Sequence, residues 1–99
     1  MELGELLKSI DGIGRKAFPA GNVASVCYAA HQCRPGSLFV AIAGLAHAGH
    51  NFIDEAVFRG ARFIVHQKDI SVPKDVIAIQ VADSRRALGV LAKNFFGDP

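Results

Sequence analysis

The stretch Arg34-Pro35-Gly36-Ser37-Leu38-Phe39-Val40-Ala41-Ile42 decides the fold class of this chain. Its first four residues favour a turn, because proline presets φ and glycine accepts a positive φ. The run from Leu38 to Ile42 is continuously apolar, which is typical of a strand that is covered on both faces. We therefore expect a buried strand here, entered through a tight turn.

Three helices are expected around this strand. The first has apolar residues at the i, i+3, i+4, i+7 spacing of a short amphipathic helix: Leu3, Leu6, Leu7 and Ile10. A second helix is expected to begin near Asn51 and to end at Gly60. Asp83 is placed to cap a third helix, whose apolar stripe runs to Phe95.

Strand patterns alternate with these helices. Besides the strand that begins at Leu38, we expect strands at 23–28, 63–65 and 76–81, the last two separated by a polar turn that contains Pro73. The helix between the Leu38 and Phe63 strands makes a crossover connection, so these two strands should be parallel. The predicted fold is α/β, a three-layer sandwich of a small mixed sheet with flanking helices.

The composition describes one small domain with a real core. The chain has 99 residues, 51% of them hydrophobic and 20% charged, which excludes a disordered chain. It has neither a run of about 20 apolar residues nor the basic start of a signal peptide, so we expect a cytoplasmic protein with no membrane partner. The net charge is +2 and the basic residues are scattered, which does not favour nucleic-acid binding. We keep nucleic-acid binding as a hypothesis that ranks below the two functions given at the end of this section.

The cysteines and histidines match no common metal motif. Cys27 and Cys33 have five residues between them, so buried structural thiols are expected, with a disulfide as the alternative. His47 and His50 lack further ligands at a recognisable spacing, and no metal site is predicted. The small residues of 44–50 suit either an anion-binding loop before the Asn51 helix or a plain connection.

No catalytic residue is predicted in this chain. Gly44 and Gly49 have the glycine spacing of a phosphate-binding loop, but His50 and Asn51 follow where lysine and a hydroxyl residue are required. The carboxylates are scattered over helix ends and turns and form no activated acid–base pair. Catalysis by this chain alone is therefore not expected.

Three segments together resemble the N-terminal domain of the Mur ligases. The segment 34–44 is similar to the family's "pGdlFvAl.G" strand, and 49–61 is similar to the "dGh.Fi..A...GA" that follows it. The segment 81–99 is similar to "V.d.r.al..la..fy..P". Their order and spacing agree over nearly the whole chain, and the match is nearest to the ligases that add the third peptide residue.

The resemblance implies a function for residues 1–99 as a single substrate-binding domain. In this family the first domain holds the UDP part of UDP-N-acetylmuramoyl-dipeptide, a peptidoglycan precursor, and further domains bind ATP with magnesium. Those central and C-terminal domains are expected to lie outside this chain, which would need no cofactor and be inactive alone. The first domain of the D-Ala-D-Ala-adding ligase, or a degenerate interaction domain, is the alternative.

The resemblance also transfers a set of candidate UDP contacts: Tyr28, Ala30, His31, Leu45, Ala46 and His47. Ala29-Ala30-His31 stands where the family has Asp-Ser-Arg, so the serine that contacts the substrate is missing, and Ala48 replaces a usual Asp. Either backbone groups and shape hold UDP, or the ligand preference has changed.

The individual contacts leave alternatives open. Tyr28 either stacks on uracil or is a half-buried strand residue, and His31 either donates a hydrogen bond or faces solvent. The tripeptide Asp83-Ser84-Arg85 repeats the missing motif in a different segment, where we expect it to cap a helix.

Overall fold

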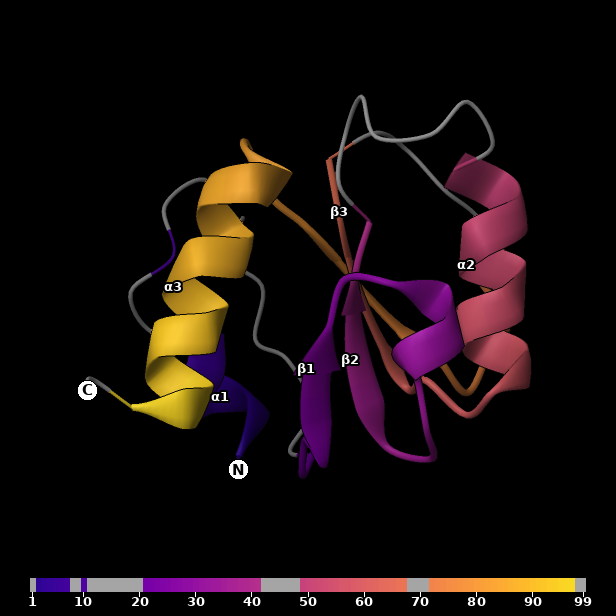
Figure 1. The fold of residues 1–99 in the computed structure, drawn as a ribbon, viewed down its shortest axis with the longest axis horizontal. Helices are drawn as coiled ribbons and strands as arrows, with labels where there is room; N and C mark the ends of the chain where they lie inside the picture. The colour runs from indigo at the N-terminus through magenta and orange to yellow at the C-terminus, as the bar shows by residue number, and fades with distance from the viewer. Residues whose placement is uncertain (1, 8–9, 11–20, 42–48, 68–71, 98–99) are drawn as a thin grey trace.

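A four-stranded parallel sheet forms the middle layer of the molecule (Figure 1). The computed structural model describes residues 2–7, 10, 21–41, 49–67 and 72–97, with the backbone alone at 49–52. The strands lie side by side in the order of the sequence: β1 (Ser25–Cys27), β2 (Ser37–Val40), β3 (Phe63–His66) and β4 (Ile77–Gln80). The helices are α1 (Leu3–Leu7), the 3₁₀ turn η1 (Ala30–Gln32), α2 (Gly49–Phe58) and α3 (Ser84–Phe96).

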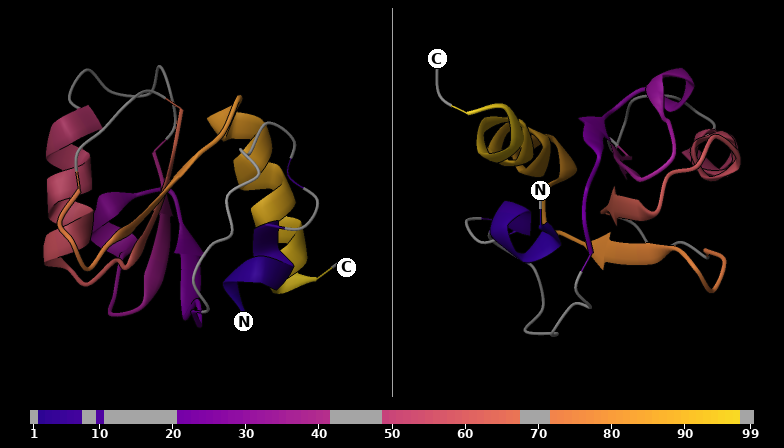
Figure 2. Two further views of the ribbon diagram at one scale, coloured as in Figure 1. Left: turned by 180° about the vertical axis from the view of Figure 1, so that it is seen from behind. Right: turned by 90° about the horizontal axis from the view of Figure 1, so that it is seen from below.

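Two layers of helices enclose this sheet, as the fold class predicts. Figure 2 shows α1 and α3 on one face of the sheet, with η1 and α2 on the other. The first face packs as one apolar cluster in which Leu38 and Val40 meet α1 and α3. Phe39 and Ile64 point the other way, into a second cluster that includes residues of η1 and α2. The continuous apolar run of β2 is therefore explained by burial on both faces.

The sheet is parallel in every strand pair that the structure describes, whereas a mixed sheet was the expectation. The β2–β3 pair is parallel as predicted, with Leu38 opposite Phe63. The β3–β4 pair is parallel as well, with Phe63 opposite Ile77. The polar turn around Pro73 is thus part of a crossover, and it carries Val72 and Val76 into the cluster on the α2 face. β4 therefore begins at the same edge of the sheet as β3.

The boundaries differ from the expected ones by a few residues. Strand β1 is shorter than the predicted range 23–28, and α2 starts two residues before Asn51. Asp83 caps α3 as predicted, since its Oδ1 accepts hydrogen bonds from the amides of Arg85 and Arg86 at 3.1 and 3.2 Å. Gly97, with φ +83°, ends the same helix.

Candidate functional site

All four strands end at the same edge of the sheet, which we call the carboxyl edge. The backbone amide of Ala41 extends the β2–β3 ladder to Val65 O at 2.8 Å, and that of Val81 extends the β3–β4 ladder to His66 O at 2.8 Å. Helix α2 follows β2, and α3 follows β4. In open α/β sheets, ligands bind outside the carboxyl ends of the strands. A binding site is therefore expected at the carboxyl edge.

The predicted contacts Tyr28 and His31 flank the carboxyl end of β1. Tyr28 directly follows the strand and is 56% exposed, so it is not the half-buried strand residue of the alternative interpretation. His31 lies in η1 and is exposed. Both side chains are accessible to a ligand from solvent.

Ala30 is placed differently, because it is only 3% exposed and belongs to the apolar cluster on the α2 face. Its methyl group packs inward, away from solvent. The carbonyl of Ala30 accepts the amide of Cys33 at 3.1 Å, and that of Ala29 accepts the amide of Gln32 at 3.0 Å. At this position only the backbone is available to a ligand.

Three of the six candidate contacts, Leu45, Ala46 and His47, lie outside the described residues. The described chain leaves the sheet at Ala41 and resumes at Gly49, the first residue of α2. Since β1 and β2 are parallel neighbours, with Cys27 opposite Phe39, Ala41 and Tyr28 leave the sheet at the same edge.

A closed turn at the opposite, amino edge sets the register of β1 and β2. The Oγ atom of Ser37, which is fully buried, accepts the amide of Arg34 at 2.9 Å and shares a hydrogen bond with the Ser25 hydroxyl at 2.7 Å. Gly36 has φ +85°, and the amide of Ser37 closes the turn on Arg34 O at 3.0 Å. The turn chemistry predicted from Pro35 and Gly36 is confirmed.

Gln67 joins the carboxyl edge to α3, a role that the sequence pattern did not indicate. Its Oε1 accepts from both the amide and the hydroxyl of Ser84, at 3.0 and 3.3 Å. Its own carbonyl accepts the side-chain amide of Gln80 at 3.2 Å. A glutamine after a strand has no local signature, so only the packed structure reveals this contact.

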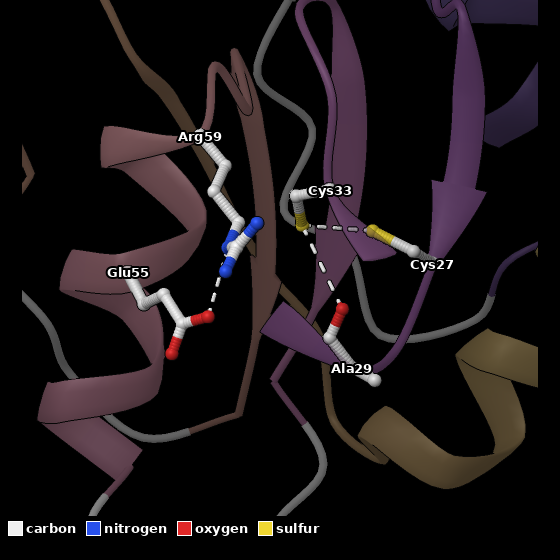
Figure 3. Close-up of polar contacts among 5 residues, drawn as sticks. All are labelled: Cys27, Ala29, Cys33, Glu55 and Arg59. Carbon is white, nitrogen blue, oxygen red and sulfur yellow. Dashed lines mark hydrogen bonds and ion pairs between the residues drawn. The ribbon is translucent and has the colours of Figure 1, made fainter. Parts of the chain in front are cut away.

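Two thiols lie beneath η1 (Figure 3). The Sγ atoms of Cys27 and Cys33 are 2.9 Å apart, and both cysteines are buried and free, as expected for structural thiols. The hydrogen bond from Cys33 lowers the pKa of the Cys27 thiol against the opposing effect of burial. The same contact and burial raise the pKa of the Cys33 thiol. The nearby Arg59–Glu55 ion pair, at 2.8 Å, is exposed and contributes little to stability.

A separate pocket of about 480 Å³ opens at the amino edge. It is lined by residues that precede or begin the strands: Gly21, Asn22, Pro35, Gly36, Gly60, Arg62, Phe63 and Ile77. This hollow lies at the edge of the sheet opposite to Tyr28, and of the predicted contacts that the structure describes, Tyr28, Ala30 and His31, none lines it. It therefore offers a ligand an alternative place to bind.

The described residues contain neither a metal-binding cluster nor a membrane-spanning helix. Histidine, cysteine, aspartate and glutamate side chains form no group of three or more that could hold a metal ion there. Among the described helices, none has the length and apolar character needed to cross a membrane.

Comparison with known proteins identifies the family. The family model "Mur ligase family, catalytic domain" matches residues 22–96. A UDP-N-acetylmuramoyl-L-alanyl-D-glutamate–2,6-diaminopimelate ligase from Alkaliphilus metalliredigens is 38% identical over 99 residues, covering 100% of this chain and 20% of the relative. The ligase of the same name from Clostridium perfringens is 35% identical with the same coverage.

The solved structures agree on the fold. A UDP-N-acetylmuramoylalanyl-D-glutamyl-2,6-diaminopimelate–D-alanyl-D-alanyl ligase from Acinetobacter baumannii superposes with a TM-score of 0.71 at 24% identity, covering 91% of this chain and 20% of that one. The chain thus spans about a fifth of the length of the relatives that it matches. Because the family model covers most of its residues, the chain belongs to the Mur ligase family.

Proposed function

We propose that this chain is the domain of a peptidoglycan-precursor ligase that holds the UDP part of UDP-N-acetylmuramoyl-dipeptide. The observation that carries the proposal is the match of the family model over residues 22–96, together with relatives named as diaminopimelate-adding ligases. The placement of Tyr28 and His31 beside the carboxyl end of β1 supports it, since this edge is where ligands bind in such sheets.

The side chains suit different parts of a uridine nucleotide. The ring of Tyr28 is exposed enough to stack on uracil, and His31 can donate a hydrogen bond to a phosphate oxygen. Ala30 supplies no hydroxyl, so backbone groups and shape hold the ligand at that position. One lost hydrogen bond weakens binding by about 1–2 kcal/mol, which leaves a binding site in place. Leu45, Ala46 and His47 complete the proposed set.

The reaction belongs to the rest of the enzyme. As expected for this family, ATP with magnesium would phosphorylate the substrate carboxylate, which gives an acyl phosphate and releases ADP. The amine of the incoming amino acid would then displace phosphate and form the amide bond. In this proposal the present domain binds the substrate, and the other domains of the enzyme carry out these steps. Diaminopimelate is the first amino acid to test, because the relatives' names specify it.

An assay of the full-length protein tests this function. With UDP-N-acetylmuramoyl-dipeptide, ATP, magnesium and diaminopimelate, we expect the tripeptide, ADP and phosphate in equal amounts. A product formed only from the tripeptide precursor and D-Ala-D-Ala would instead assign the protein to the other ligase, whose fold is shared. Failure to consume ATP with either pair of substrates would favour a degenerate interaction domain.

A further inference from the structure

The two thiols under η1 form a pair that the binding function does not use. Their Sγ atoms are 2.9 Å apart, and the cysteines are 5% and 7% exposed. Cys27 lies at the end of β1 and Cys33 directly after η1, so the pair bridges both ends of the segment 28–32. Figure 3 shows the two side chains pointing toward one another, with Cys33 also directed at the Ala29 carbonyl.

We propose that Cys27 and Cys33 form an oxidation site that hydrogen peroxide converts reversibly into an intramolecular disulfide. The two Sγ atoms need to approach one another by less than about 1 Å to reach the bond length of a disulfide. Figure 3 shows that the two sulfurs already face one another. Peroxide is small enough to reach thiols whose burial would exclude a larger disulfide reagent.

The chemistry divides the two cysteines into an attacking and a resolving thiol. The sulfur of Cys27 attacks one peroxide oxygen, the O–O bond breaks, and sulfenic acid and water are formed. The sulfur of Cys33 then displaces the sulfenic oxygen as a second water, and the S–S bond forms. The two thiols lose two electrons and two protons, and one peroxide is reduced to two waters. The hydrogen bond from Cys33, and to a smaller extent the Arg34 side chain, lower the pKa of the Cys27 thiol, which suits Cys27 to the first step.

The disulfide would hold the segment 28–32 in a covalent ring. This segment contains Tyr28, Ala30 and His31, so the oxidation site lies directly beneath three of the candidate substrate contacts. The thiol of Cys27 also lies 3.6 Å from the carbonyl of Leu38 in β2, and this weak contact is lost on oxidation. Oxidation therefore changes the covalent structure of the proposed binding edge without touching an exposed side chain.

The test is peroxide treatment of the protein followed by alkylation of free thiols and digestion with chymotrypsin without reductant. Cleavage after Tyr28 separates the two cysteines into different peptides, unless a disulfide joins them. We expect joined peptides lighter by two hydrogens than the sum of the reduced ones, and their separation on adding dithiothreitol. Because only these two cysteine peptides are analysed, oxidation of Met1 does not change the measured masses.

Two variants and a stability measurement control the experiment. Cys27→Ala and Cys33→Ala should each give no joined peptides, and the oxidised wild type should unfold at a higher urea concentration than the reduced one, because the cross-link restricts the unfolded chain. Separate peptides bearing alkylated or sulfinic cysteines in the treated wild type would overturn the proposal. So would disulfides that join only two different molecules.

Discussion

Gly60 lies directly against Pro35, so that a Cβ built on Gly60 would stand 2.7 Å from the Cα of Pro35. The carbonyl of Gly60 also accepts the amide of Gly36 at 3.0 Å. The turn that precedes β2 and the turn that precedes β3 are therefore interlocked at the amino edge. This contact sets where both strands begin, and hence where they end at the carboxyl edge.

Gly60→Ala should destabilise the protein by about 2–4 kcal/mol. The residue has φ +111°, which alanine adopts only with strain, and the new methyl group would meet backbone that cannot move aside. Urea denaturation followed by circular dichroism measures the loss. The matched control is Gly89→Ala, at an exposed position of α3 where nothing lies within 4 Å and about 0.5–1 kcal/mol of stabilisation is expected. Equal effects of the two substitutions would contradict the interlocked turns.

Removing the cap of α3 should cost about 1 kcal/mol. Asp83→Ala leaves the amides of Arg85 and Arg86 without their acceptor. Asp83→Asn keeps a side-chain oxygen in place and should stay within a few tenths of a kcal/mol of the wild type. The urea midpoints of the two variants provide the comparison, and an alanine variant as stable as the asparagine variant would exclude capping.

Ser37→Ala should cost about 1–3 kcal/mol, and more than Ser25→Ala. The Ser37 hydroxyl is fully buried and contacts both Arg34 N and the Ser25 hydroxyl, whereas Ser25 takes part in one of these two bonds. The two free energies of unfolding, measured side by side, give the order. If Ser25→Ala is the more damaging change, the turn does not depend on Ser37 as described.

The order of elements could be predicted because the apolar spacing was regular. The run from Leu38, the stripe of α3 and the Pro35–Gly36 turn each appear in the structure where the sequence placed them. The direction of β4 could not be predicted, because a turn around Pro73 suits a hairpin and a crossover equally well. Only the packing of Val72 and Val76 on the α2 face distinguishes the two.

The candidate site was predictable in part for a similar reason. Tyr28 is the last residue of the expected strand 23–28, so its place at a strand end was predicted, whereas the edge of the sheet to which it belongs was not. The inward orientation of Ala30 depends on the 3₁₀ turn η1 and on contacts with residues of α2, which no local pattern specifies. The approach of Cys27 to Cys33 arises in the same way, since it requires the chain to fold back between them.

Ala30→Ser should destabilise the protein by about 1–3 kcal/mol and leave the Kd of the UDP-sugar unchanged. The side chain of Ala30 is 3% exposed and packs into the apolar cluster on the α2 face, so the new hydroxyl would be buried and not presented to a ligand. Urea denaturation and calorimetric titration measure the two quantities. The control is Ala24→Ser, an exposed position before β1 that should leave both unchanged. A lower Kd in the Ala30→Ser variant would show that the side chain at position 30 reaches the ligand.

The most direct test of the central claim is an NMR titration of the protein with UDP and with UDP-N-acetylmuramoyl-dipeptide. The account predicts saturable shifts of the amides of residues 28–31 and 44–50, with little change at Asn22, Gly60 and Arg62 around the amino-edge pocket. Shifts centred on Asn22, Gly60 and Arg62, or no shifts at millimolar ligand, would contradict UDP binding at the carboxyl edge.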